Sequence, residues 1–192
     1  MQRCQDRAIN QNFTGKSQFI ELTKNQEQKR IKDLCSKYGR GKAPKYVEKS
    51  PIKVINQACI YWDGLHLENV KYQSEYKFKE DNMLAPGTVL LNATGTGTLG
   101  RSYVFDETDG VYMVDSHVTI FHLKPDIMIP RFLQVFFSLD STQKTIYADC
   151  VNGSTNQIEL SKEKIGDIMI PVPEYRAQEQ YIYFVHQSDK SK

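Results

Sequence analysis

The chain has 192 residues, a formal net charge of +2 and 40% hydrophobic residues, which is enough for one domain with a buried core. No run of about 18 apolar residues occurs, which excludes a transmembrane helix. The polar start "MQRCQDRAINQN" lacks the apolar centre of a signal peptide, so we expect a cytoplasmic protein.

Positive charge gathers in residues 29–53, where nine Lys or Arg residues stand against two acids, Asp33 and Glu48. The local balance is +7, and the rest of the chain therefore carries −5. A local positive field on a near-neutral protein suggests an anionic partner that meets one face. A solvated surface loop is the alternative interpretation.

In the N-terminal part, residues 1–22 favour a helix that Gly15 interrupts. The segment "QKRIKDLCSKYG" (28–39) predicts a short amphipathic helix that ends at Gly39. The residues expected to point inward from this helix are Ile31, Leu34 and Cys35. A loop rich in Gly, Pro and Lys follows.

The middle of the chain favours strands. "IKVINQACIYW" (52–62) predicts a strand that runs into an irregular connection, and "APGTVLLNATG" (85–95) predicts a turn followed by a strand. "RSYVF" (101–105) and "GVYMVDSHVTIFHL" (110–123) are typical of further strands, joined by a tight turn at "DETDG".

After these strands the apolar period becomes helical. Residues 129–151 predict two helices broken near residues 139–141. A polar loop at 152–161, a short helical turn, the strand "DIMIPVP" (167–173) and a final helix from about Glu174 complete the chain. The predicted class is α+β, a mostly antiparallel twisted sheet with helices in the C-terminal half.

The stretch Gly95-x-Gly97-x-x-Gly100 matches the dinucleotide-binding fingerprint. That motif needs a helix after its glycines, because the helix N-terminus meets the pyrophosphate. The following residues, "RSYVF", have the composition of a strand instead. We therefore interpret the glycines as a β-turn and expect no cofactor there.

Catalytic motifs are weak. Asp63, Glu75 and Lys77 are spaced loosely like a metal-binding site, so a metal-dependent nuclease stays open as an alternative function. Residues 115–117 (Asp-Ser-His) fall on a predicted strand whose successive side chains face opposite ways, and we expect ordinary sheet residues. The four cysteines form no CxxC pair, which indicates reduced, mostly buried thiols rather than a zinc cluster.

A binding surface fits the composition better. Cations neutralise phosphates and aromatic rings add sugar and base contacts, so we expect Arg40, Lys42 and Lys45 to contact phosphates, with Tyr46 nearer the bases. The polar segment "NGSTNQ" (152–157) suits hydrogen bonding to base edges, although a helix-capping turn explains the same composition. Its candidate base contacts are Ser154, Thr155 and Asn156.

Five stretches in order resemble the target-recognition domain of type I restriction-modification specificity subunits. The resemblance places the end of a spacer helix and a linker at 1–22, the recognition domain at 23–173 and the start of a conserved spacer helix at 174–192. The stretches are "KSQFIEL", "APGTVLLNATGTGTLGR", "VDSHVTIFHLKPDIMIPRFLQVFFSL", "VNGSTNQIELSKEKIGDIMIPVP" and "PEYRAQEQYIYFV".

The resemblance implies a non-catalytic subunit that reads one half of a split double-stranded DNA target. Methylation subunits would bind the spacer helices, flip the target adenine and methylate it, and restriction subunits would join them. S-adenosylmethionine, ATP and magnesium are then expected on those partner subunits, and no cofactor on this chain.

The chain departs from the family pattern, since members usually carry two recognition domains and two long helices. A half-length subunit that pairs with a second such chain, an exchangeable cassette and a truncation all remain open. A pure protein-interaction module is a further alternative, because the C-terminal helix has apolar positions suited to a partner helix. These positions are Tyr175, Tyr181, Ile182 and Val185.

Overall fold

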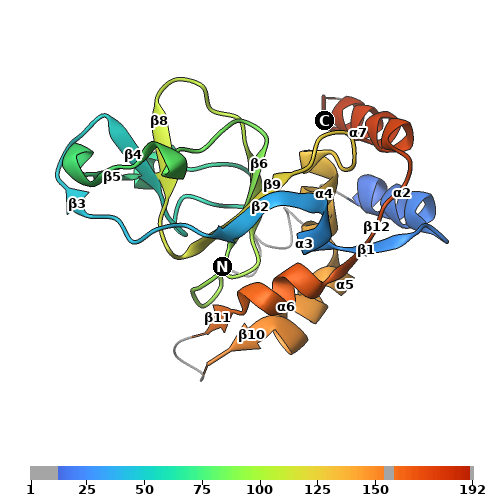
Figure 1. Ribbon diagram of the computed structural model, residues 1–192. Helices are drawn as coiled ribbons and strands as arrows, with labels where there is room; N and C mark the ends of the chain where they lie inside the picture. Colours follow the sequence, from blue (N-terminus) through green and yellow to red (C-terminus); the bar gives the residue numbers. More distant parts are fainter. Residues whose placement is uncertain (1–12, 154–157, 191–192) are drawn as a thin grey trace.

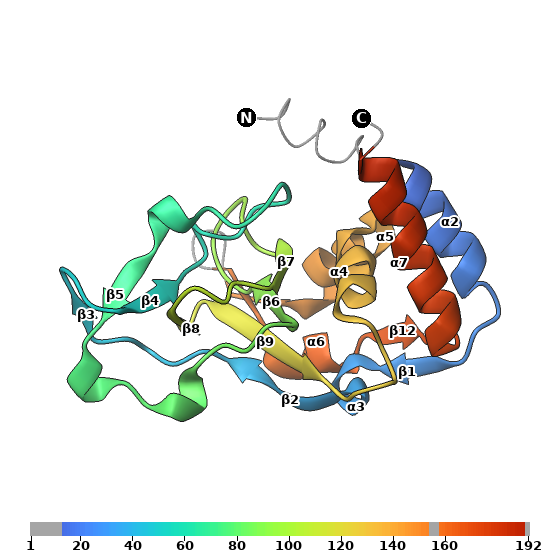
Figure 2. The ribbon, with the colours of Figure 1, turned by 90° about the horizontal axis from the view of Figure 1, so that it is seen from above.

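The computed structural model describes residues 13–153 and 158–190. Two four-stranded sheets hold most of its strands, and the longer helices gather at the opposite end of the molecule from the second sheet (Figures 1 and 2). The expected α+β class with mostly antiparallel pairing is confirmed. Within the described ranges, no helix is long and apolar enough to cross a membrane.

The first sheet has the strand order β2-β9-β6-β7 and is antiparallel throughout. Its central strand β6 is buried on both faces, because Val89 and Leu91 pack into the core beneath the helices while Leu90 packs into a second core. The alternation follows from the two-residue period of a strand. The strands are β2 (Cys35–Arg40), β6 (Thr88–Asn92), β7 (Ser102–Phe105) and β9 (Val118–Leu123).

The second sheet has the order β3-β5-β4-β8, and its β4–β8 pair is parallel. Three 3-10 turns flank it. The predicted tight turn at 106–110 is wrong, because β7 pairs with β6 and β8 pairs with β4, so this segment crosses between sheets. The elements are β3 (Tyr46–Val47), β4 (Ile52–Ile55), η1 (Leu67–Asn69), β5 (Lys71–Gln73), η2 (Glu75–Lys77), η3 (Glu80–Asn82) and β8 (Val111–Val114).

The helical segment after β9 is broken as predicted. The helix α4 (Pro130–Ser138) ends before Leu139, whose backbone is extended, and α5 (Asp140–Thr145) begins directly after it. A π-helical turn, η4 (Ile146–Cys150), continues α5. The buried face of α4 carries Phe132 and Phe136 into the main core.

The N-terminal part differs from the prediction. Residues 28–39 form β1 (Gln28–Arg30), the single turn α3 (Ile31–Leu34) and most of β2 instead of one helix. The pairing of β1 with β12 and of β2 with β9 overrides the local helical pattern. The predicted inward residues, Ile31, Leu34 and Cys35, are nevertheless buried.

The helix α2 (Phe13–Thr23) runs through Gly15 without the predicted break. A Cβ at Gly15 would lie 3.4 Å from Cγ2 of Val185, so this residue allows the helix to approach α7 closely. Figures 1 and 2 show α2 and α7 side by side.

The C-terminal part follows the prediction for the last strand and helix. It contains β10 (Val151–Asn152), β11 (Glu159–Leu160), α6 (Lys162–Asp167), β12 (Met169–Pro171) and α7 (Tyr175–Lys190). The hydroxyl of Ser161 accepts a hydrogen bond from the backbone N–H of Lys164 and so caps α6.

Three cysteines, Cys35, Cys59 and Cys150, are free and buried, as expected. Burial raises the pKa of the Cys35 thiol to about 12 and that of Cys59 to about 11. These thiols are therefore structural core residues. The fourth cysteine, Cys4, lies outside the described residues.

Candidate nucleic-acid interface

The glycine-rich stretch forms the connection between the antiparallel strands β6 and β7. Gly95, Gly97 and Gly100 all have φ between 83° and 96°, a region that glycine enters without a Cβ clash. The N–H of Gly100 donates to the carbonyl of Asn92 at 2.9 Å, which closes the loop. The interpretation as a β-turn is confirmed, because a strand and not a helix follows the glycines.

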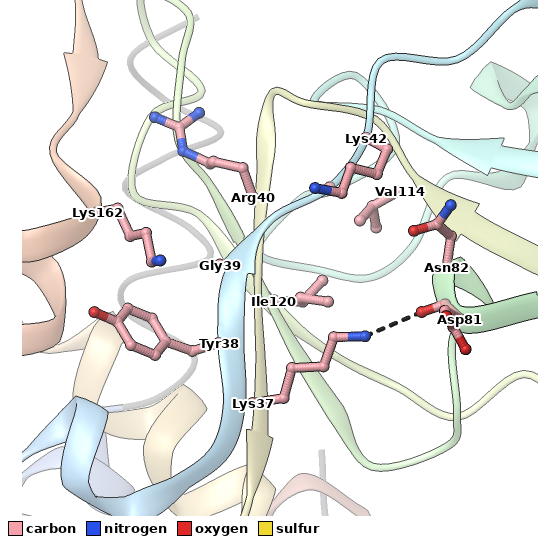
Figure 3. Close-up of a pocket in the computed structure, with 11 residues that line it drawn as sticks. Lys37, Tyr38, Gly39, Arg40, Lys42, Asp81, Asn82, Val114, Ile120 and Lys162 are labelled. Carbon is pink, nitrogen blue, oxygen red and sulfur yellow. Dashed lines mark hydrogen bonds between the residues drawn. The ribbon is translucent and has the colours of Figure 1, made fainter. Parts of the chain in front are cut away.

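A basic trough lies between the end of β2 and η3. It consists of two adjoining hollows of about 390 and 470 Å³, which share Lys37, Lys42, Asp81 and Asn82. Figure 3 shows the first hollow. The cationic residues that line the basic trough are Lys37, Arg40, Lys42, Lys77, Lys79 and Lys162.

The lysines of the basic trough differ in their contacts. The ammonium of Lys37 donates to the backbone carbonyl of Asp81 at 3.0 Å, which links β2 to η3 (Figure 3). Lys162 lies over the ring of Tyr38 at 5.0 Å. Lys42 is exposed, and Lys45, also exposed, lines neither hollow. Of the predicted phosphate contacts, Lys42 therefore faces the basic trough.

Arg40 also lines the basic trough, but its guanidinium is engaged within the chain. Nη2 donates to Oε1 of Glu159 and to the carbonyl of Leu160, both at 2.7 Å, and Nη1 donates to the carbonyl of Ser116 at 3.0 Å. Only 18% of the side chain is exposed. Burial lowers the pKa of Arg40, and Glu159 opposes that shift. The sequence predicts a phosphate contact for Arg40. That role does not explain why its guanidinium is bonded to groups of its own chain.

Tyr46, expected near the bases, lies on the edge strand β3 with 44% of its surface exposed. Its hydroxyl donates to Oδ2 of Asp115 at 3.3 Å, and the ammonium of Lys71 lies 4.9 Å from its ring centre. Asp115 is only 2% exposed, and burial raises the pKa of its carboxyl.

The other predicted base contacts, Ser154, Thr155 and Asn156, lie outside the described residues. The strands that flank them, β10 and β11, pair antiparallel. The N–H of Leu160 donates to the carbonyl of Ala93 at 2.8 Å, so β11 is tied to the start of the glycine turn.

Residues 115–117 form the connection between β8 and β9, so their placement on a regular strand is wrong. Oδ1 of Asp115 accepts from the backbone N–H of His117 at 2.9 Å. Such a side-chain bond to the second following N–H stabilises a turn. The sequence did carry a signal for this turn: Asp115 stands two residues before His117, between two apolar runs.

The structure does not bring the proposed nuclease residues together as a metal site. Asp63 contacts Nε2 of His66 at 3.3 Å, while Glu75 and Lys77 lie on η2. Among residues 13–153 and 158–190, no group of three or more His, Cys, Asp or Glu side chains could hold a metal ion.

The apolar side of α7 faces a helix of its own chain. Tyr181 and Val185 are buried, and the hydroxyl of Tyr181 donates to the carbonyl of Gly15 on α2 at 2.8 Å. The rings of Tyr181 and Phe19 lie 5.6 Å apart, edge to face. Tyr175 and Ile182 are partly buried. At Tyr181 and Val185, α2 therefore lies where the sequence predicted a partner helix, and the predicted partner contacts of Tyr175 and Ile182 stay a prediction.

Comparison with known proteins identifies a matching family model and solved structures of similar fold. A family model described as the type I restriction modification DNA specificity domain matches residues 23–192. A search of curated proteins finds no match.

Solved structures share the fold at low sequence identity. The HsdS subunit from Thermoanaerobacter tengcongensis has a TM-score of 0.61 at 13% identity over 99% of this chain and 46% of its own. A chain from a study of complex assembly and conformational transition of the type I R-M system has a TM-score of 0.63 at 12% identity. The match covers 100% of this chain and 49% of that chain. The type I S subunit from M. genitalium has a TM-score of 0.54 at 12% identity over 99% and 47%. The chain thus spans about half the length of these proteins.

Proposed function

The chain belongs to the family of type I restriction modification DNA specificity domains, and from this premise we propose that it reads one half of a split duplex DNA target. In this proposal residues 23–173 are the recognition domain, and 1–22 and 174–192 belong to spacer helices. The chain itself carries no catalysis and directs partner subunits to the DNA.

The basic trough is the observation that carries the proposal. Its six cationic side chains come from separate segments; Asp81 is the acid that lines it, and Glu159 pairs with Arg40. Such a surface neutralises a phosphate backbone and positions a duplex without reading its sequence. Lys42 and Lys162 are exposed on it, and we assign them to phosphates.

The proposal extends to the partners. Methylation and restriction subunits of the type I complex would supply the chemistry, with S-adenosylmethionine, ATP and magnesium bound on those subunits. The DNA and these partners imply a cytoplasmic location. A second half-length chain would supply the other half-site if the complex needs two recognition domains.

Salt-dependent DNA binding tests the basic trough. The variants are Lys42→Ala and Lys162→Ala, with Lys144→Ala as control, because Lys144 is exposed on α5 and does not line the trough. Each lost phosphate contact should reduce the slope of log Kobs against log salt by about 0.9. A slope equal to that of Lys144→Ala in both trough variants would contradict the assignment.

Target reading is tested by methylation. The chain is combined with a type I methylation subunit from the same source, and adenine methylation is mapped across a genome at single-base resolution. We expect a split motif in which one half changes when residues 23–173 are exchanged for another recognition domain. A motif that stays the same after the exchange would refute the proposal.

A further inference from the structure

Three polar side chains from separate segments meet beside the glycine turn. Thr94 begins that turn, Gln57 follows β4, and His117 belongs to the β8–β9 connection. The hydroxyl of Thr94 lies 2.6 Å from Oε1 of Gln57 and 3.0 Å from Nδ1 of His117. His117 is exposed, and Gln57 and Thr94 are partly exposed.

Backbone and buried side-chain bonds hold this cluster in place. Oδ1 of Asp115 fixes the N–H of His117, and the carbonyl of His117 accepts from the N–H of Ala93 at 2.9 Å. Arg40 holds the same connection through the carbonyl of Ser116. The carbonyl of Gln57 accepts from Nδ2 of Asn92, which is fully buried, at 2.9 Å. The backbone around the three side chains is thus held in a fixed arrangement.

The single proton of the Thr94 hydroxyl decides what the cluster presents to solvent. When that hydroxyl donates to Oε1 of Gln57, the neutral His117 must donate from Nδ1. Gln57 then presents its NH₂ group as a donor, and Nε2 of His117 is an acceptor. We assign these protons from the hydrogen-bond network.

The opposite orientation of the Gln57 amide leads to the same combination of one donor and one acceptor. If the amide of Gln57 donates to Thr94, the hydroxyl donates to Nδ1 of His117. Gln57 then presents an oxygen acceptor, and His117 presents an N–H donor. In both arrangements the two side chains offer one donor and one acceptor. These outer atoms have no hydrogen-bond partner among residues 13–153 and 158–190.

We propose that Gln57 and His117 form a base-reading pair, coupled by Thr94, that recognises the major-groove edge of an adenine. This inference rests on the proposed DNA-reading function. Adenine presents one acceptor, N7, beside one donor, the N6 amino group, whereas guanine presents two acceptors, N7 and O6. Thymine presents one acceptor and a methyl group, and cytosine one donor. Adenine is therefore the base whose own edge complements one donor and one acceptor.

The test is base preference, measured on the full chain, alone and with its methylation subunit. Wild type selects its preferred duplex from a randomised pool, and each base of that site is then varied. We expect Gln57→Glu, His117→Ala and Thr94→Val each to reduce the preference for adenine at one and the same position about tenfold or more. For His117→Ala and Thr94→Val, affinity for unrelated DNA and its salt dependence should stay unchanged, whereas the added negative charge of Gln57→Glu should weaken binding to all DNA. Replacing that adenine by 7-deazaadenine should weaken wild-type binding and affect the variants less.

Two controls separate recognition from folding. Thr94→Ser keeps the hydroxyl and should retain the preference, whereas Thr94→Val removes it. His186→Ala changes an exposed histidine on α7 and should leave the preference intact.

The outcomes distinguish this inference from the proposed function. If wild type selects a sequence while Gln57→Glu and His117→Ala select the same bases as strongly, the base-reading pair is refuted and the DNA-reading function stands. If wild type selects no sequence under either condition, both fail. Loss of preference in Thr94→Ser equal to that in Thr94→Val would refute the role of the hydroxyl.

Discussion

Arg40 offers the sharpest separation of a structural role from a DNA contact. Its guanidinium joins β11 to the β8–β9 connection through bonds to two backbone carbonyls and to Glu159. Arg40→Met keeps most of the apolar stem and removes every one of these donors. The carbonyls of Ser116 and Leu160 would then lose a charged partner.

The expected loss follows from these contacts. A hydrogen bond from a charged donor contributes about 1.5–3 kcal/mol, and two such bonds go to partly buried carbonyls. The ion pair adds about 0–1 kcal/mol, because 62% of the Glu159 side chain is exposed. Since water can replace part of these bonds, we expect Arg40→Met to lower the free energy of unfolding by about 3 kcal/mol, which lowers Tm by roughly 6–12 °C.

Urea unfolding and DNA binding together provide the assay. Glu159→Gln should lower the unfolding free energy by less than about 1 kcal/mol, and Arg40→Lys should fall between wild type and Arg40→Met because an ammonium cannot form the same fork. If Arg40→Met unfolds like wild type and reduces the salt slope of DNA binding like Lys42→Ala, the residue is a phosphate contact and the structural role is wrong.

Three further predictions concern the glycine turn, the thiols and a buried acid. Both Gly97 and Gly100 have positive φ, but only at Gly100 would a Cβ meet Oε1 of Gln143, at 2.6 Å. Gly97→Ala should therefore lower the unfolding free energy by about 1–2 kcal/mol, and Gly100→Ala should lower it by more. Equal losses of unfolding free energy in urea would contradict the steric argument. Because burial raises the pKa of Cys35 to about 12, iodoacetamide at pH 8 should modify it in urea and leave it intact in the folded protein; equal rates would disprove this. Burial raises the pKa of Asp115, so its contribution to stability is fully present below the ordinary Asp pKa of about 3.9 and is lost as pH rises through the raised folded value. Asp115→Asn should therefore flatten the decrease in unfolding free energy across that window, and an unchanged pH profile would show that another group is responsible.

Local sequence predicted the parts of the fold that local chemistry controls. Leu139 separates α4 from α5, and the glycines between β6 and β7 form a turn, because both depend on backbone preferences of a few residues. The prediction of a helix over residues 28–39 was wrong for the opposite reason. Their helical period correctly placed Ile31 and Leu34 in the core, but pairing with β12 and β9 decided the backbone conformation.

The candidate site was predicted in part for a similar reason. The positive charge near Lys42 is visible in the sequence because it is contiguous. Lys77, Lys79 and Lys162 join the basic trough only through the fold, so no local pattern marks them. The same holds for Gln57, Thr94 and His117, which are separated by more than twenty residues at each step.

The nested pairing of the chain has a consequence for how it folds during synthesis. Early segments pair with late ones in concentric order: β2 with β9, β1 with β12, and α2 with α7. Contacts of such long sequence separation slow folding. A nascent chain that has not yet released residues 169–171 from the ribosome leaves the edge of β1 unpaired and open to aggregation. We therefore expect the growing chain to stay protease-sensitive until β12 and α7 have emerged.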